Sequence, residues 1–423
     1  MRRLLLLLFL LLPLPFSAFA QSPKPLSLAD AEALYLQHNR ELALARAAAG
    51  SAEADVRTAG QRPNPQASLN LLSISPWSGY GAGGWKDKKM DTQLRLDQVV
   101  ERGGKRELRL REAEARRDAA HQDIDEAGRQ QLLALRWAYY DLLLAQDRER
   151  LVREAAELYG RTIAAGQLRQ KAGDISPIDL SRLQIEQARA ENDTRQARAE
   201  LEQAQIALAY LIGREAQAST LKAEDNWPGL ETRETLPAHR PRPDIEAARL
   251  RLAAAEAARD QAKAKKIRDL TVSVQLEHNL QNAPTNSYGF GVSMPLFIWH
   301  EYEGEIARAE AELDAARLQY NRTLAQATGD THQAGTLLRS AQDRRRRLET
   351  GLLADAEKVA RAAEFAFGKG AMSLMDLLDA RRTLRQVQLE ASAARAEHAK
   401  ALAAWQLQGA FLAALPDSNK EAP

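Results

Sequence analysis

Two stretches of this sequence can form helices far longer than those of ordinary globular domains. Residues 104–172 contain no proline and few glycines, and residues 301–369 form a second such stretch. Both are rich in alanine, leucine and charged residues, which favour helix. At 1.5 Å per residue, roughly 68 helical residues span about 100 Å. We therefore expect an elongated molecule in which long helices pack side by side.

The two halves of the chain repeat each other. Three groups of residues recur 196 or 197 positions further along the chain. The most specific is Gly-x-x-Ser-x-x-Asp-Leu, which begins at Gly173 and again at Gly370, because it falls where a helix has to stop. Such matches indicate an internal duplication. Each half has the same order of elements: a helix, two short alternating segments, a very long helix, a tight turn and a returning helix.

Prolines and changes of pattern place the boundaries of these units. The leading helices are expected at about 28–60 and 243–266, and a long loop is expected at about 73–90. The predicted organisation begins with a signal peptide at 1–20 and a first repeat at 21–213, which contains a strand pair at about 65–100 and a long helical hairpin at about 104–213. A linker at 214–242 follows in the middle of the helical rod. The second repeat at 243–413 contains a strand pair at about 269–296 and a hairpin at about 301–413, and a tail at 414–423 ends the chain.

The first twenty residues have the three parts of a secretory signal peptide. Arg2 and Arg3 precede an apolar run over residues 4–12, and Ala18-Phe19-Ala20 has the form of a cleavage site. No later segment approaches the run of about 18 apolar residues that a membrane-spanning helix needs. We expect an exported protein without a transmembrane helix.

The composition excludes several classes of protein. Among 423 residues there is no cysteine, which excludes disulfides, thiolate metal sites and a cysteine-linked lipid. The 59 basic and 57 acidic residues nearly balance, whereas a nucleic-acid-binding protein would carry a basic excess. No catalytic motif is present, and seven scattered histidines predict neither a metal centre nor a cofactor. We expect no enzyme and no nucleic-acid partner.

The alternating segments have the pattern and length of membrane-spanning strands. Apolar residues such as Val272 and Val274 alternate with polar ones such as Ser273 and Gln275. Each segment is about nine or ten residues long, the length of a tilted transmembrane strand. A soluble antiparallel sheet would show the same alternation, but the chain lacks further strands to complete a sandwich.

The four strands of one chain are too few to form a membrane barrel alone. They cannot close a barrel alone, because eight is the usual minimum, and open sheet edges cannot lie in lipid. If the strands are in a membrane, several chains must share one barrel. Val272 and Val274 would then face lipid, and Ser273 and Gln275 would face the lumen.

Three features together carry a resemblance to a known family. They are the duplicated helix–strand–strand–helix plan, the strand end Val292-Ser293-Met294-Pro295-Leu296, and the turns near Gly173 and Gly370. The chain resembles the TolC family of outer-membrane efflux proteins, and the segment 101–106 resembles the start of the long helix in its CzcC-like, heavy-metal branch. The resemblance implies a mainly α fold with a small β part: duplicated long helical hairpins form a trimeric α-barrel, and four strands per chain contribute to a shared twelve-stranded transmembrane β-barrel.

The same resemblance implies a function. The chain would be the outer-membrane channel of a tripartite efflux system in a Gram-negative cell, a passive duct across periplasm and outer membrane. Its partners would be two further copies, outer-membrane lipid, a periplasmic adaptor (membrane fusion) protein and an inner-membrane pump of the RND type. The branch implies divalent metal ions as cargo; drugs, other small molecules or type I secretion are the alternative. A periplasmic coiled-coil adaptor would explain the helices but not the duplicated strands.

The turns between outgoing and returning helices are the candidate working end. Glycine permits the left-handed conformation that ends a helix, and serine is a good N-cap. These residues can simply make the turn, and the resemblance adds a role in docking the adaptor. The positions concerned are Gly173, Ser176, Gly370 and Ser373.

Three aspartates near these turns are the candidate aperture gate. Asp376 and Asp379 are three positions apart and share a helix face. Stabilisation of a carboxylate by the helix dipole is the simpler explanation. By resemblance, residues 373–380 correspond to the family stretch in which two aspartates ring the closed periplasmic aperture. Six such carboxylates in a trimer would favour cations. Asp179 keeps the position of the first-turn aspartate to which an Arg and a Tyr of the second turn latch in the family prototype. Those two positions are Met372 and Phe367 here, so apolar packing is expected in place of the polar latch.

Overall fold

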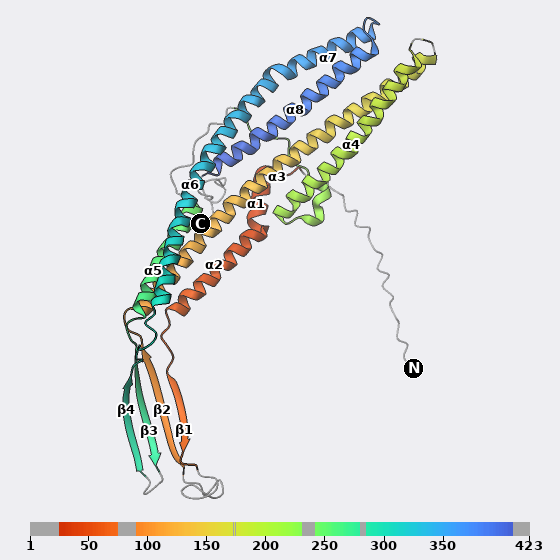
Figure 1. The fold of residues 1–423 in the computed structure, drawn as a ribbon. Helices are drawn as coiled ribbons and strands as arrows, with labels where there is room; N and C mark the ends of the chain where they lie inside the picture. The colour runs from red at the N-terminus through yellow and green to blue at the C-terminus, as the bar shows by residue number, and fades with distance from the viewer. Residues whose placement is uncertain are drawn as a thin grey trace, which may run out of the picture.

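The computed structural model describes residues 25–74, 90–171, 173, 175–230, 242–279 and 285–408. The signal peptide expected at 1–20, most of the loop at about 73–90 and the tail expected at 414–423 lie outside these residues. The described part is elongated, with a four-stranded sheet at one end and two helical hairpin tips at the other (Figure 1). None of its helices is both long and apolar enough to cross a membrane.

The first hairpin consists of α3 (Lys105–Lys171, 67 residues) and α4 (Pro177–Ile212). Both agree with the helices expected from the sequence. Ser176 caps α4, and Pro177 occupies the first turn, where an amide donor is not needed. Gly213 ends α4 in the left-handed conformation, with φ of 68°.

The leading helix of the first half is broken, so the expectation of one helix over about 28–60 is wrong. The structure has α1 (Leu28–His38) and α2 (Arg40–Ala59), separated by Asn39 in an extended conformation. The Asn39 side chain accepts a hydrogen bond from the first turn of α2 (3.0 Å) and so acts as its N-cap. The same side chain donates to the Leu211 carbonyl of α4 (3.4 Å), so a tertiary contact fixes the break.

The second hairpin has an interrupted outgoing helix. α6 (Glu303–Arg347) passes through a π-helical turn (Leu348–Leu352) into α7 (Leu353–Gly368), and α8 (Leu374–Gln406) returns. The expectation of a regular α-helix over 301–369 is therefore wrong at the π turn. Such a turn inserts an extra residue without ending the helix, and π turns are frequent at functional positions.

The sheet contains β1 (Gln66–Leu72), β2 (Asp91–Val100), β3 (Leu270–Asn279) and β4 (Thr285–Ser293). The strands lie in sequence order, and all neighbours are antiparallel. The pairing of β2 with β3 joins the two halves of the duplication in the middle of the sheet. β1 is shorter than expected. Among the described residues, β1 and β4 each have one edge without a partner strand.

The linker expected at 214–242 crosses the middle of the rod. It contains a short 3-10 helix (Glu215–Thr220) and a parallel bridge between Leu26 and Ala223, and its residues 231–241 lie outside the described part. The main hydrophobic core lies here, where α1, α3, α4, α8 and the linker meet. Its large and fully buried side chains include Tyr35, Leu132, Leu135, Tyr139, Leu142, Leu208, Ile212 and Leu407.

A second recurring group, Gln-Asp-Arg at 146–148 and again at 342–344, contacts this linker in both halves of the chain. The Gln146 amide donates to the Ala223 carbonyl (3.1 Å) and accepts from the Ala223 N–H (2.8 Å). Its counterpart Gln342 donates to the Leu230 carbonyl (2.6 Å). The duplicated glutamine therefore performs the same task in each half. Beyond the linker, α5 (Pro243–Ala264) packs against α3 and α6.

Candidate functional site

Both hairpins end in the tight turns that the sequence predicts. Gly173 and Gly370 have φ of 85° and 75°, in the left-handed region that glycine adopts without steric cost. The two tips lie at the same end of the molecule, opposite the sheet (Figure 1). The duplicated turns are therefore placed where a second protein can reach both of them.

Two of the candidate gate aspartates belong to helix caps. The Ser176 hydroxyl accepts a hydrogen bond from the Asp179 amide (3.1 Å) and donates to its carboxylate (2.8 Å). Ser373 makes the same pair of contacts with Asp376, at 3.2 and 2.7 Å. Each serine satisfies one of the free amides at the start of its helix. The local explanation thus accounts for Asp179 and Asp376.

No local contact accounts for Asp379. Its side chain is exposed in α8, and within the described residues it forms neither a hydrogen bond nor an ion pair. The arginines that follow it contact other carboxylates, in the pairs Arg381–Glu364, Arg382–Glu186 and Arg385–Asp193. The Asp379 carboxylate therefore remains available to a solute. Within one chain, no described contact joins Asp179 to Asp376 or Asp379.

The two hairpins contact each other below their tips, which the sequence analysis missed. Leu378 of α8 belongs to a buried cluster with Leu180 of α4 and Ile163 of α3. Arg382 of α8 forms an ion pair with Glu186 of α4 (3.0 Å). These contacts hold the second tip against the first hairpin within one chain, so any separation of the tips must break them.

The apolar residues of the sheet share one face, and that face is exposed. Val274 lies opposite Phe290 in β4 and Leu96 in β2. Phe290 is 85% exposed and Val274 is 45% exposed. A soluble sheet would bury this face against a core, so the chain needs another apolar environment here. The further exposed members are Leu69, Leu71, Leu94, Val272, Leu276, Tyr288 and Val292.

The opposite face carries the polar residues, including Ser273 and Gln275. Gln275 accepts a hydrogen bond from Gln93 of β2 (3.2 Å). A Cβ atom on Gly289 would come within 2.7 Å of the Gln275 side chain. One on Gly291 would come within 2.5 Å of the Ser273 hydroxyl. The two glycines let β3 side chains lean over β4, so the sheet can curve toward its polar face.

A buried charged network beside the π turn also escaped the sequence analysis. Arg345, which is 7% exposed, contacts the His398 Nδ1 (3.1 Å) and donates to the Pro228 carbonyl (2.6 Å). It also pairs with Glu349 (3.2 Å), which accepts a second bond from Arg395 (2.5 Å). The network joins α6, the π turn, α8 and the linker. No local pattern predicts it, because Arg345 and His398 are 53 positions apart.

This network predicts a pH-dependent stability. Burial, and then the Arg345 cation, lower the pKa of His398 below its usual value of 6.5, while Glu349 acts in the opposite direction. Below pH 6.5 the unfolded chain binds a proton that the folded protein resists, so the free energy of unfolding falls as pH falls. The contribution of this histidine disappears well above pH 6.5, where the unfolded chain is deprotonated as well.

The measurement is the thermal unfolding temperature at pH 7.5 and pH 5, for the wild type and for His398→Gln. We expect the variant to lose less stability on acidification, because it lacks the titrating group. An equal loss in both proteins would show that His398 does not control the response.

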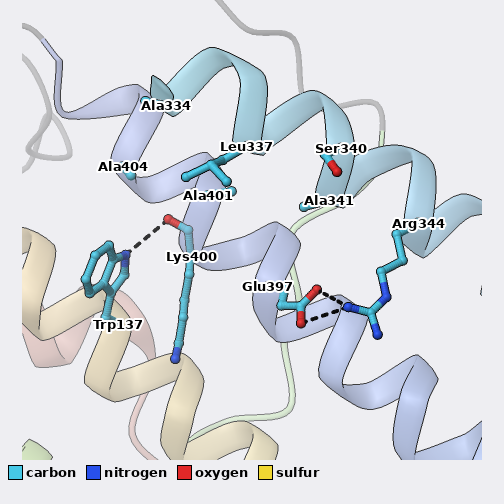
Figure 2. Close-up of a pocket in the computed structure, with 10 residues that line it drawn as sticks. All are labelled: Trp137, Ala334, Leu337, Ser340, Ala341, Arg344, Glu397, Lys400, Ala401 and Ala404. Atoms are coloured by element: carbon cyan, nitrogen blue, oxygen red, sulfur yellow. Dashed lines mark hydrogen bonds and ion pairs between the residues drawn. The ribbon is translucent and has the colours of Figure 1, made fainter. Parts of the chain in front are cut away.

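A groove of about 410 Å³ lies between α3, α6 and α8, and its main polar groups are paired with one another (Figure 2). Its Trp137 donates to the Lys400 carbonyl (3.1 Å), and Arg344 pairs with Glu397 (2.8 Å), so these polar groups are satisfied within the chain. Throughout the described ranges, no cluster of three or more His, Asp or Glu residues could hold a metal ion.

These features define a class of protein. A membrane-sized sheet with an apolar outer face continues into long helical hairpins, and the polar face of the sheet can curve around a lumen. A sequence profile described as "Outer membrane efflux protein" matches residues 33–214 and 238–407, and the chain belongs to this family. It is an efflux channel protein of the outer membrane and not an enzyme.

Individual relatives agree with this assignment. The cobalt-zinc-cadmium resistance protein CzcC of Cupriavidus metallidurans is 29% identical over 316 residues, which cover 72% of this chain and 74% of the relative. The outer membrane protein VceC of Vibrio cholerae has the same fold, with a TM-score of 0.74 at 22% identity over 91% of this chain and 96% of its own. The CmeC outer membrane channel of Campylobacter jejuni gives 0.76 at 18% identity over 92% and 86%.

Proposed function

We propose that three copies of this chain form one outer-membrane exit duct. The observation that carries the proposal is the sheet, whose outer face is apolar and exposed and whose edge strands β1 and β4 each have an unpaired edge among the described residues. In lipid such edges must be paired, and β4 of one copy can pair with β1 of the next. Three copies close a barrel of twelve strands, with Ser273 and Gln275 facing its lumen.

The hairpin tips are the periplasmic end of this duct. The turns built on Gly173, Ser176, Gly370 and Ser373 dock a periplasmic adaptor, which links the duct to an inner-membrane pump of the RND type. Asp376 and Asp379 of three chains form the aperture ring, and Asp179 lies on the adjoining tip. The free carboxylate of Asp379 supports this role better than that of Asp376, which accepts a hydrogen bond from the Ser373 hydroxyl.

Divalent metal ions are the cargo that we assign to the duct. Similarity to a cobalt-zinc-cadmium resistance protein supports this assignment. A ring of carboxylates at the aperture would also concentrate cations and repel anions. Drugs, other small molecules and type I secretion substrates are the alternative cargo.

A deletion strain of the native host tests the cargo. Loss of the chain should lower the minimal inhibitory concentrations of zinc, cobalt and cadmium salts severalfold, because the exit step is missing. The wild-type gene should restore tolerance, and an assembly-defective variant should not. Unchanged metal tolerance together with a lost tolerance to hydrophobic drugs would favour the alternative cargo.

A further inference from the structure

The connection from β4 to α6 exposes large apolar side chains at the helical end of the sheet. Leu296 and Ile298 are 67% and 64% exposed, and Trp299 is 95% exposed. Exposed apolar groups gathered in one place mark a contact surface. Tryptophan in particular collects where a membrane meets water.

A hollow of about 530 Å³ beside this connection carries excess positive charge. Its lining includes Arg102, Lys266 and Arg268 against the single carboxylate of Glu301. Within the described part of the chain, none of the three cationic groups forms an ion pair. The Arg268 guanidinium lies 5.4 Å from the centre of the Phe297 ring. The three cations are therefore available to an anionic ligand.

Hydrogen bonds and close packing hold together the two segments that line this hollow, the one after β2 and the one before β3. The backbone N–H of Arg102 donates to the Asp269 carboxylate (2.9 Å), and Lys105 donates to the same carboxylate (2.8 Å). Gly103 has φ of 73°, and a Cβ atom there would come within 2.7 Å of the Ile267 side chain. The two strand ends are thus locked together at a position where only glycine fits.

The hollow lies at the end of the apolar face of the sheet. Val100 and Leu270 are partners at the last rung between β2 and β3. Arg102 follows Val100 by two residues, and Arg268 precedes Leu270 by two. Both arginines therefore lie just beyond the ends of these strands, at the helical end of the sheet. A molecule that covers this face therefore meets the cations at its helical end.

We propose that this hollow binds the phosphodiester headgroup of an anionic glycerophospholipid in the periplasmic leaflet of the outer membrane. The acyl chains lie along the apolar face, and Trp299 sits at the membrane surface. Guanidinium groups match phosphate oxygens in charge and geometry. The inference rests on the proposed function, since the trimeric duct places this rim at the periplasmic side of the membrane.

The test uses the trimer reconstituted in vesicles of equal phosphatidylglycerol and phosphatidylethanolamine. After detergent extraction, native mass spectrometry counts the lipids that remain bound. The wild type should retain phosphatidylglycerol in preference to phosphatidylethanolamine. The variant Arg102→Gln, Lys266→Gln, Arg268→Gln should retain about tenfold less of it. A matched control, Arg195→Gln, Arg198→Gln, Arg322→Gln, removes three exposed cations elsewhere and should behave as the wild type.

Brominated acyl chains supply a second measurement. They should quench the part of the tryptophan fluorescence that disappears in Trp299→Phe. Equal retention of both lipids by the wild type, or unchanged retention in the triple variant, would overturn the proposal, as would absence of quenching at Trp299. Conductance of the same trimers in a planar bilayer separates the two proposals: a conducting trimer without bound lipid refutes only the lipid site.

Discussion

Val274→Arg should prevent assembly of the trimer in a membrane, whereas Gln275→Arg should be tolerated. Val274 is the fifth residue of the ten-residue β3 and belongs to the exposed apolar face, between Phe290 and Leu96. A cation on the lipid side of a barrel near the bilayer middle costs roughly 2–4 kcal/mol per chain. Gln275 lies on the polar face next to Gln93, where water can solvate the new charge.

The fraction of trimer in detergent extracts, measured by native mass spectrometry, checks this expectation. The two variants are adjacent, carry the same new side chain and differ only in the face that receives it. Each is therefore the control for the other. If both variants assemble equally well, or equally badly, the two faces are not in different environments and the sheet is not in a membrane. A stable wild-type monomer would contradict the trimer itself.

The elements that the sequence predicts correctly are those fixed by local patterns. α4 begins at Pro177 and ends at Ile212, as expected, because a proline with a serine cap starts it and a glycine ends it. The two faces of the strands are also predicted correctly, because apolar and polar residues alternate along each strand and the pairing of neighbouring strands keeps each kind on one face. The duplication adds a second copy of each signal, which makes the turns at Gly173 and Gly370 recognisable.

The elements that the sequence misses depend on contacts between distant segments. Asparagine is tolerated inside helices, and Asn39 breaks one because its side chain also reaches the Leu211 carbonyl of α4. The π turn has no signature of its own in the hydrophobic pattern. The buried pair of Arg345 and His398 depends on how α6 and α8 align, which neither helix specifies alone.

In the candidate gate, one part of the structure is predicted by the sequence and another part is not. Ser373 and Asp376 were expected to start a helix, and their reciprocal hydrogen bonds fulfil that expectation. The position of Asp379 beside them could be predicted from helical spacing. The sequence could not predict that the Asp379 carboxylate has no partner within the described chain. This depends on Arg381 and Arg382, which form ion pairs with other carboxylates. The structure therefore distinguishes the Asp376 carboxylate, which is hydrogen-bonded to Ser373 at the start of α8, from the free carboxylate of Asp379.

Asp376→Asn with Asp379→Asn should remove most of the block that divalent cations exert on the channel. In the trimer these residues contribute six carboxylates to a narrow ring, where each cation gains from several negative charges at once. In a planar bilayer we expect low wild-type conductance that added divalent cations reduce further. The double variant should need about tenfold more cation for the same block, which corresponds to about 1.4 kcal/mol. Its cation selectivity should fall as well.

The single variant Asp379→Asn distinguishes the gate from the cap. It removes the free charge and leaves the contacts between Ser373 and Asp376 intact. Asp355→Asn is the matched control, because Asp355 is an exposed carboxylate of α7, 72% accessible, that lies outside the turn. If stabilising the start of α8 were the only role of these aspartates, Asp376→Asn would lower stability by about 0.3–1 kcal/mol and leave cation block unchanged. A folded Asp379→Asn trimer that is blocked as strongly as the wild type would refute the gate, since its one altered property is the charge that the gate requires.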